Sequence, residues 1–253
     1  MLDIKDDLTK DKYLPSLAVE SLTGCAGELL VILENVDKML PYLVVRRFPF
    51  AQSTNDDSTI DIALVEGSVS QEHDVAKVKE IRGRSRYLVA VGNCAIYGCV
   101  QKCNKASVKS LDESVYGSFI NTKALPSKPI DAYVKVDVKL TGCPINATQL
   151  LSTVASLLRD NFPNITHKPV CLECKLKENP CILIENNEPC LGPITSAGCG
   201  ALCPSFSSPC YGCFGPCSGA QIEAMTKVLS KKGYDLNEIL NRLNTFGQNI
   251  KIT

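Results

Sequence analysis

Eight cysteines in the C-terminal half fall into two groups of four with the spacing of metal or cluster ligands. The first group lies in CLECKLKENPC and EPCLGP, and the second in GCGALCP and PCYGC. Zinc takes four thiolates in a closed tetrahedron, and a 4Fe–4S cluster also takes four thiolates. The Cys-Pro step and the neighbouring glycines favour iron–sulfur. The candidate ligands are Cys171, Cys174, Cys181 and Cys190, then Cys199, Cys203, Cys210 and Cys213.

Three cysteines of the N-terminal half each come where a predicted strand ends. Cys25 lies in LTGCAGE, Cys94 in GNCAIYGC and Cys143 in TGCPI. Ligands of open α/β sheets gather beyond the carboxyl ends of the strands, so we expect the three cysteines to converge on one site. The alternative is that each is a small buried hydrophobic residue, which explains less well why all three lie beside glycine.

The composition limits the compartment and the partners. Residues 1–12 are charged and have no apolar stretch for a signal peptide, and no run approaches the roughly 18 apolar residues of a transmembrane helix. With 14 cysteines, we expect a cytoplasmic chain whose thiols serve metal or redox chemistry. The 27 basic residues balance 27 acidic ones, which argues against a nucleic-acid partner. The sequence has no Ser/His/Asp arrangement, no P-loop and no GxGxxG motif.

Strands and helices are predicted to alternate over residues 1–163. Short apolar runs typical of buried parallel strands alternate with segments of helical spacing. This order implies right-handed βαβ crossovers and a parallel sheet. The predicted strands cover 16–23, 42–46, 61–65, 87–91 and 136–140, and the predicted helices cover 28–40, 72–81 and 147–159.

The amino-acid composition changes after residue 161. Nine of the 14 cysteines lie between Cys171 and Cys217, with frequent Pro and Gly and little hydrophobic periodicity. Such a segment builds little core from side chains, so its fold is expected to depend on inorganic cores held by thiolates. Two short helices are predicted over 219–231 and 236–244. We therefore expect an α/β domain over 1–163 and a small cysteine-rich domain over 164–253.

Seven segments resemble the small, electron-transferring subunit of nickel–iron hydrogenases. They are LTGCAGELL, ALVEGSV, VAVGNCAIYGCVQ, LTGCP, CLECK, CLGPITSAGCGALCP and CYGCFGP, in order, between residues 17 and 216. The likeness is to the cytosolic sulfhydrogenase or coenzyme-linked type, and the N-terminal part is similar to the 20 kDa subunit of complex I. The resemblance implies a flavodoxin-like N-terminal domain with a proximal cluster and a C-terminal domain with medial and distal clusters.

The resemblance also implies a ligand set for each cluster. In periplasmic relatives a His replaces the first distal Cys and a Pro replaces one medial Cys. This chain has Cys at both positions, so two all-cysteine 4Fe–4S clusters are implied. The proximal positions are Cys25, Cys94 and Cys143. The distal positions are Cys171, Cys174, Cys181 and Cys190, and the medial positions are Cys199, Cys203, Cys210 and Cys213.

The proximal motif departs from the family pattern. The family motif begins CxxC, and this chain has Glu28 at the fourth position. The fourth ligand is therefore Glu28, or Cys99, or absent. A carboxylate is a harder ligand than a thiolate and should change the potential or the stability of the cluster. Four further candidates are expected to hold no metal: Cys103, Cys217, His73 and His167.

The resemblance implies an electron-transfer subunit without its own active site. The nickel–iron centre would lie in a separate large subunit that faces the loops of Cys25, Cys94 and Cys143, and electrons would leave to a flavin or iron–sulfur acceptor subunit. One alternative is a degenerate or zinc-stabilised interaction protein without hydrogenase activity. A complex-I-like module is disfavoured by the eight-cysteine extension. Glu66, near this interface, is expected either in a proton or interface network or as a helix cap or solvated residue.

Overall fold

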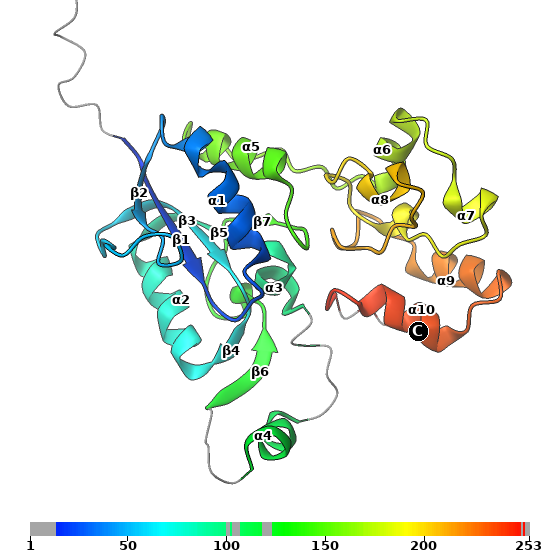
Figure 1. The fold of residues 1–253 in the computed structure, drawn as a ribbon, viewed down its shortest axis with the longest axis horizontal. Coiled ribbons are helices and arrows are strands. Elements are labelled where there is room, and N and C mark those ends of the chain that lie inside the picture. The colour runs from blue at the N-terminus through cyan, green and yellow to red at the C-terminus, as the bar shows by residue number, and fades with distance from the viewer. Residues whose placement is uncertain (1–13, 100–101, 103–106, 118–122, 249, 251–253) are drawn as a thin grey trace, which may run out of the picture.

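The computed structural model describes residues 14–99, 102, 107–117, 123–248 and 250. Figure 1 shows two lobes beside each other, an α/β lobe with the sheet and a helical lobe with the C-terminal cysteines. The charged residues 1–12 and Cys103 lie outside the described residues.

The α/β lobe is built on a five-stranded parallel sheet. Its order is β2-β1-β3-β5-β7, which by position along the chain is the flavodoxin-like doubly wound order 2-1-3-4-5. The expected flavodoxin-like parallel sheet is thus confirmed. The strands are β1 (Ser16–Ser21), β2 (Val44–Arg47), β3 (Ile60–Glu66), β5 (Ser85–Val91) and β7 (Val138–Leu140).

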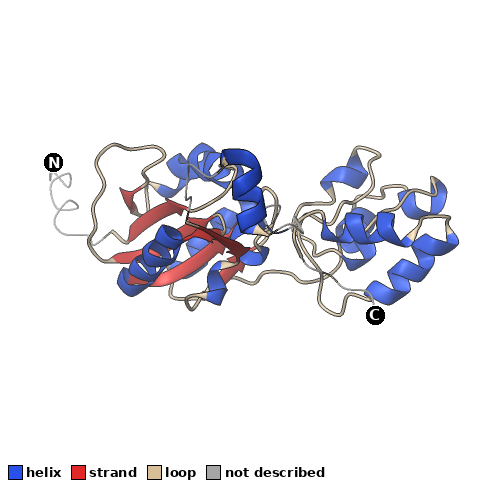
Figure 2. Cartoon of the chain, turned by 90° about the horizontal axis from the view of Figure 1, so that it is seen from below, coloured by secondary structure: helices blue, strands red, loops and turns tan. Residues whose placement is uncertain are grey.

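Helices cover both faces of this sheet (Figure 2). On one face, α1 (Gly27–Met39) and α5 (Ala147–Leu157) pack on Ile62 and Leu64 of β3. On the other face, α2 (Glu72–Arg84) and α3 (Gly92–Tyr97) pack on Ala63 and Val65. Because alternate residues of a strand point to opposite faces, the central strand is apolar on both sides. Burial of each large side chain stabilises the fold by about 1.5–3 kcal/mol.

Several short elements are absent from the sequence prediction. Strands β4 (Val69–Gln71) and β6 (Ala124–Lys128) pair antiparallel outside the main sheet. Helix α4 (Val108–Tyr116) and the 3-10 turn η2 (Ile130–Ala132) also belong to the α/β lobe. These segments carry no extended apolar run, so pattern alone does not reveal them.

The helical lobe combines short helices with two longer ones. The cysteine-rich stretch forms α6 (Val170–Leu176), α7 (Ile182–Glu185), η3 (Gly192–Ile194) and α8 (Leu202–Ser205). Two helices, α9 (Ile222–Lys231) and α10 (Leu236–Asn244), close the chain as expected. Leu191 and Ile194 pack against α9 and α10 in a small apolar core. The lobe therefore has more side-chain core than the cysteine-rich stretch alone predicts.

Glycines of the helical lobe receive side chains of the α/β lobe. A Cβ on Gly198 would lie 2.0 Å from Nε2 of Gln149, and one on Gly215 would lie 2.4 Å from Oη of Tyr97. Both glycines have positive φ angles, 128° and 73°, which L side chains rarely adopt. The contact between the lobes thus depends on glycine at these points. Within the described ranges no helix has the length and apolar character needed to cross a membrane.

Candidate metal centres

The proximal candidates lie at one edge of the sheet. Cys25 follows β1, Cys94 lies in the first turn of α3 after β5, and Cys143 follows β7. Two hydrogen bonds join the last two loops: Asn93 N donates to the Gly142 carbonyl at 2.9 Å, and Gly142 N donates to Oδ1 of Asn93 at 3.1 Å. The carboxyl ends of the parallel strands thus bring these two loops together.

Cys25 reaches the same edge from the start of α1. Its side chain is exposed. A Cβ on Gly27 would lie 3.4 Å from Cys25 Sγ and 4.0 Å from Cβ of Pro144. Gly27 therefore lies close to both Cys25 and Pro144, the residue that follows Cys143. Figure 1 shows α1 and α3 beginning at this end of the sheet, toward the helical lobe.

Cys99 is a third thiol in the group formed by Cys94 and Cys143. It is fully buried and has a positive φ of 43°. Hydrogen bonding to Cys143 and to Cys94, together with burial, raises the pKa of Cys99 far above its ordinary value, and the contact with Cys99 lowers the pKa of Cys143. The structure therefore brings the alternative fourth ligand next to two proximal candidates.

Glu28 is buried in the first turn of α1, with 1% of its surface exposed. Its carboxylate lies over Gly92, where a Cβ would come within 2.4 Å of Oε1. Within the part of the chain that the structure describes, Glu28 Oε2 has no hydrogen-bond partner. Burial raises the pKa of Glu28 to about 6, its backbone hydrogen bond opposes this, and the charge of Glu66 adds to it.

Glu66 is also buried, at the last position of β3. It accepts a hydrogen bond from the Ser21 hydroxyl. Burial raises the pKa of Glu66, while the Ser21 hydrogen bond and the Lys77 charge lower it. The expectation of a helix cap or solvated residue is wrong, because Glu66 is buried and the N-caps of α1 and α2 are Ala26 and Gln71.

The four distal candidates gather around α6 and α7. Cys171 and Cys174 lie on α6, and Cys181 caps α7. A Cβ on Gly192 would lie 3.4 Å from Cys171 Sγ and 3.5 Å from Cys190 Sγ, so these two sulfurs flank one backbone position. Burial, followed by the charges of Cys190, Cys174 and Cys181, raises the pKa of Cys171 to about 11.

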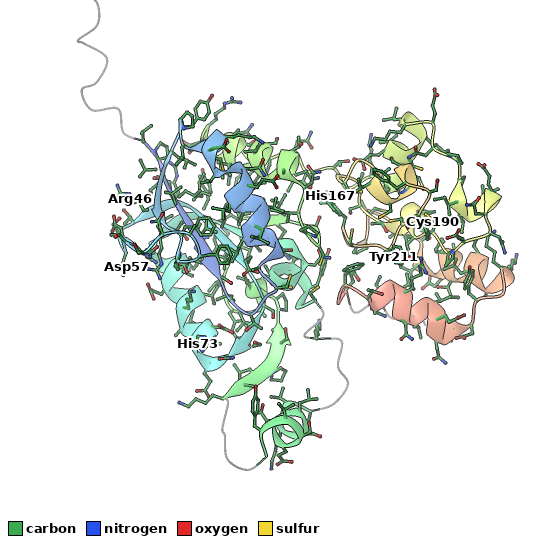
Figure 3. The ribbon with its side chains drawn as sticks, viewed as in Figure 1. Arg46, Asp57, His73, His167, Cys190 and Tyr211 are labelled. Carbon is green, nitrogen blue, oxygen red and sulfur yellow. The ribbon has the colours of Figure 1, made fainter. Side chains whose placement is uncertain are left out.

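The medial candidates lie between the other two sets. Burial, followed by the charges of Cys199, Cys203 and Cys143, raises the pKa of Cys213 to about 12. Cys213 therefore lies near both its own set and the proximal set. On the other side, Cys210 N donates a hydrogen bond to Cys190 Sγ at 3.2 Å. Figure 3 places Cys190 beside the loop of Tyr211 in the helical lobe.

The remaining candidates lie elsewhere. Cys217 is buried, and its thiol donates to the Pro193 carbonyl at 3.7 Å. His73 and His167 are exposed, and Figure 3 places them on α2 and in the connection between the lobes. Within the described ranges, no three His, Cys, Asp or Glu side chains are arranged to hold a single metal ion.

Two polar residues inside the cysteine motifs are missing from the sequence prediction. Asn93 is completely buried between the proximal and medial sets, and Glu173 on α6 accepts hydrogen bonds from the medial loop. Each is adjacent in sequence to a candidate ligand, and this is the signal that would have singled them out. Their contacts cross between segments far apart in the chain, which one sequence does not show.

In this chain a flavodoxin-like sheet with thiols at its carboxyl edge is followed by a cysteine-rich lobe, and known proteins are similar to it in sequence and in fold. The family model of the NADH ubiquinone oxidoreductase 20 Kd subunit matches residues 23–157. The chain is 38% identical over 236 residues to Sulfhydrogenase 2 subunit delta of Pyrococcus furiosus, with 92% of this chain and 99% of that protein covered. It is 33% identical to one subunit of the F420-non-reducing hydrogenase vhu of Methanocaldococcus jannaschii, covering 77% of this chain and 79% of that protein.

Solved structures agree with these relatives. A crystal structure of an NAD+-reducing NiFe-hydrogenase in the H2-reduced state matches with a TM-score of 0.53 and 26% identity, covering 60% of this chain and 95% of that one. A NiFeSe-hydrogenase of Dm. baculatum shares the fold, with a TM-score of 0.59 and 15% identity over 81% of this chain and 95% of its own. The chain belongs to the family of 20 kDa complex I subunits and nickel–iron hydrogenase small subunits. It is accordingly a hydrogenase-type subunit of an oxidoreductase complex.

Proposed function

We propose that this chain is the electron-transfer small subunit of a cytoplasmic nickel–iron hydrogenase. It would relay electrons between a nickel–iron site in a large subunit and a flavin or iron–sulfur acceptor subunit. The observation that carries this proposal is the continuity of the three cysteine sets. Cys213 of the medial set lies near Cys143 of the proximal set, and the backbone N of Cys210 donates a hydrogen bond to Sγ of Cys190 of the distal set at 3.2 Å.

The donors fit 4Fe–4S clusters. Buried thiols with raised pKa values, such as Cys210 and Cys213 at about 12, are protonated in the metal-free chain, and iron binding would displace these protons. When bound, the clusters supply one-electron carriers whose potentials depend on ligands, hydrogen bonds and burial. The distal and medial sets each offer four thiolates. We place the proximal cluster in a domain over 1–163 and the other two in a domain over 164–253.

We propose Glu28 as the fourth proximal ligand beside Cys25, Cys94 and Cys143. Two features support this assignment. Its Oε2 is buried without a hydrogen-bond partner among the described residues, and Gly92 leaves room for the carboxylate where any other residue would place a Cβ. A buried acceptor left unpaired costs about 1–3 kcal/mol, and a metal bond would satisfy it. Cys99, which contacts Cys94 and Cys143, is the alternative ligand.

The two ends of the relay differ in their surroundings. Cys25 is exposed at the carboxyl edge of the sheet, where a large subunit would have to face the proximal cluster. At the other end Cys181 is exposed, and the nearby helices α6 and α7 expose Leu176 at 78% and Ile184 at 75%. Exposed apolar side chains of this kind mark interaction surfaces, so the acceptor subunit is expected at the distal end.

The test is iron, acid-labile sulfide and zinc per chain in anaerobically purified protein. Three clusters predict about twelve irons with matching sulfide. About eight irons would mean that the proximal site is empty, which would contradict a relay that reaches a nickel site. Zinc in place of iron would overturn the electron-transfer function.

A pair of variants then decides the fourth proximal ligand. Glu28→Gln removes the carboxylate and keeps the size of the side chain, whereas Cys99→Ser removes the thiol. If Glu28 is the ligand, E28Q loses about four irons per chain or shifts the potential of one cluster, and C99S retains the full iron content. The reverse result would assign Cys99.

A further inference from the structure

Asn93 connects the proximal and medial sets through both ends of its amide. It is completely buried. Its Oδ1 accepts from Gly142 N, next to Cys143, at 3.1 Å. Its Nδ2 donates to the carbonyl of Cys213 at 2.6 Å. Because Asn93 also precedes Cys94 directly, one side chain binds the loops of three candidate ligands in two sets.

Glu173 makes the equivalent connection between the distal and medial sets. It lies on α6 between Cys171 and Cys174. Its Oε1 accepts from Gly198 N at 2.9 Å, and its Oε2 accepts from Ala201 N at 3.2 Å and from the Cys199 thiol at 4.0 Å. The backbone on both sides of Cys199 is thus held by a residue of the distal helix.

Glu185 offers a useful contrast, because its contact stays inside one set. Its Oε1 accepts from Cys181 N at 2.7 Å, and both residues belong to the distal segment. A carboxylate that only orders a ligand loop therefore exists in the same lobe. Asn93 and Glu173 differ from it because each joins two sets.

We propose that Asn93 and Glu173 are positioning residues that fix the separation of neighbouring clusters, Asn93 for the proximal–medial step and Glu173 for the medial–distal step. The inference rests on the proposed function. Electron transfer between two carriers slows steeply as their separation grows, so a small shift of one ligand loop has a large effect.

The test uses the purified hydrogenase complex with its full chain. Asn93→Asp keeps the size of the side chain but removes the donor to Cys213, and Glu173→Gln removes one of two charged acceptors. The control for the first is Asn55→Asp, because Asn55 accepts from Phe48 N at 2.9 Å in a loop of the α/β lobe and can still do so as Asp. Glu185→Gln is the matched control for the second.

Two readouts separate positioning from stability. Iron and sulfide per chain report whether the clusters are retained, and the magnetic interaction between neighbouring reduced clusters in electron paramagnetic resonance reports their separation. We expect N93D to weaken the proximal–medial interaction and E173Q the medial–distal one, each at unchanged iron content. The matching transfer step, followed by freeze-quench after reduction, should slow roughly 10- to 100-fold. E185Q should alter the distal signal alone, and N55D should resemble the parent chain.

The outcomes divide cleanly. Unchanged interactions and rates in fully loaded N93D and E173Q would overturn the inference and leave the proposed function intact. A parent chain without iron would overturn the proposed function itself. If N93D loses a cluster, Asn93→Ser, which removes the amide without adding a charge, replaces it. An N93S chain with full iron and a parental interaction would equally overturn the role of Asn93.

Discussion

The two lobes of this chain differ in where their candidate ligands lie relative to the apolar core. In the α/β lobe, Leu17, Leu64 and Val89 fill a core made of aliphatic side chains, and the thiols lie at the edge of the sheet. In the helical lobe, Cys190 and Cys210 are themselves members of a core cluster with Val170 and Ala201. The core of the first lobe is made of side chains other than its candidate ligands, whereas two candidate ligands of the second lobe are part of its core.

The largest expected effect comes from removing one ligand in each lobe. Cys190→Ser should lose the distal iron together with the packing of α6 to α8, because the ligand is also core. Cys94→Ser should lose proximal iron while the sheet remains folded. Amide exchange checks this: in C190S we expect protection in the cysteine-rich segment to fall roughly 100-fold or more, with β3 unchanged. Cys217→Ser removes a buried thiol outside the sets and is the control. Equal loss of protection in both lobes of C190S would contradict the comparison.

A second pair of variants compares the apolar cores. Leu64 and Leu229 are both fully buried, one in β3 and one in α9. Leu64→Ala should destabilise the α/β lobe by about 2–5 kcal/mol, with or without iron. Leu229→Ala should show a loss of that order only in the iron-loaded protein, because we expect the fold of this lobe to depend on the clusters. Urea unfolding followed by circular dichroism, before and after chelation, measures both. An effect of L229A that survives iron removal would show that α9 and α10 fold without the clusters.

The sequence predicts the α/β lobe well because its signals are local. Buried parallel strands are apolar runs, and the strand ends locate Cys25, Cys94 and Cys143 at one edge. The helix predicted over 236–244 has the observed bounds of α10. A capping box, in which Asp235 accepts from Glu238 N, explains the sharp start of this helix.

What the sequence does not predict depends on long-range contacts. Helices α6 to α8 are short and lack hydrophobic periodicity, so pattern recognition fails there. Glu66 is buried because it lies at the end of a central strand beside Ser21. A charged residue type alone does not predict this burial. Asn93 acquires its role from the Cys213 carbonyl, 120 residues away. Hydrogen-bond partners of this kind meet only when the two lobes pack against each other.

The third prediction concerns the contact between the two lobes at Gly215 and Tyr97. Gly215→Ala would place a Cβ 2.4 Å from Oη of Tyr97 in a backbone with positive φ. Gly219→Ala is the matched control, since Gly219 also has positive φ, 68°, and nothing lies within 4 Å of its Cβ position. Both variants carry the backbone strain, and only G215A also disturbs the contact. We expect G215A to be about 1–2 kcal/mol less stable than G219A in thermal unfolding. Equal stability of the two variants would show that Tyr97 moves aside freely.

The smallest expected effect concerns pH and the α/β lobe alone. Burial raises the pKa of Glu66 in the folded chain, so the fold favours the neutral acid. The stability due to this group is fully present below its unfolded pKa and is lost as pH rises through the folded pKa. Glu66→Gln, which is always neutral, should therefore become more stable relative to the parent as pH rises.

Urea unfolding of the metal-free chain between pH 4.5 and 8 measures this difference without the acid-labile clusters. Glu80→Gln is the control, because it makes the same change at a carboxylate that is 64% exposed on α2. A difference between E66Q and the parent that stays constant with pH would mean that Glu66 keeps its charge in the fold, held by Ser21 and Lys77. In that case burial would not dominate the pKa of Glu66 at this edge of the sheet, and its charge would be present to raise the pKa of the neighbouring Glu28.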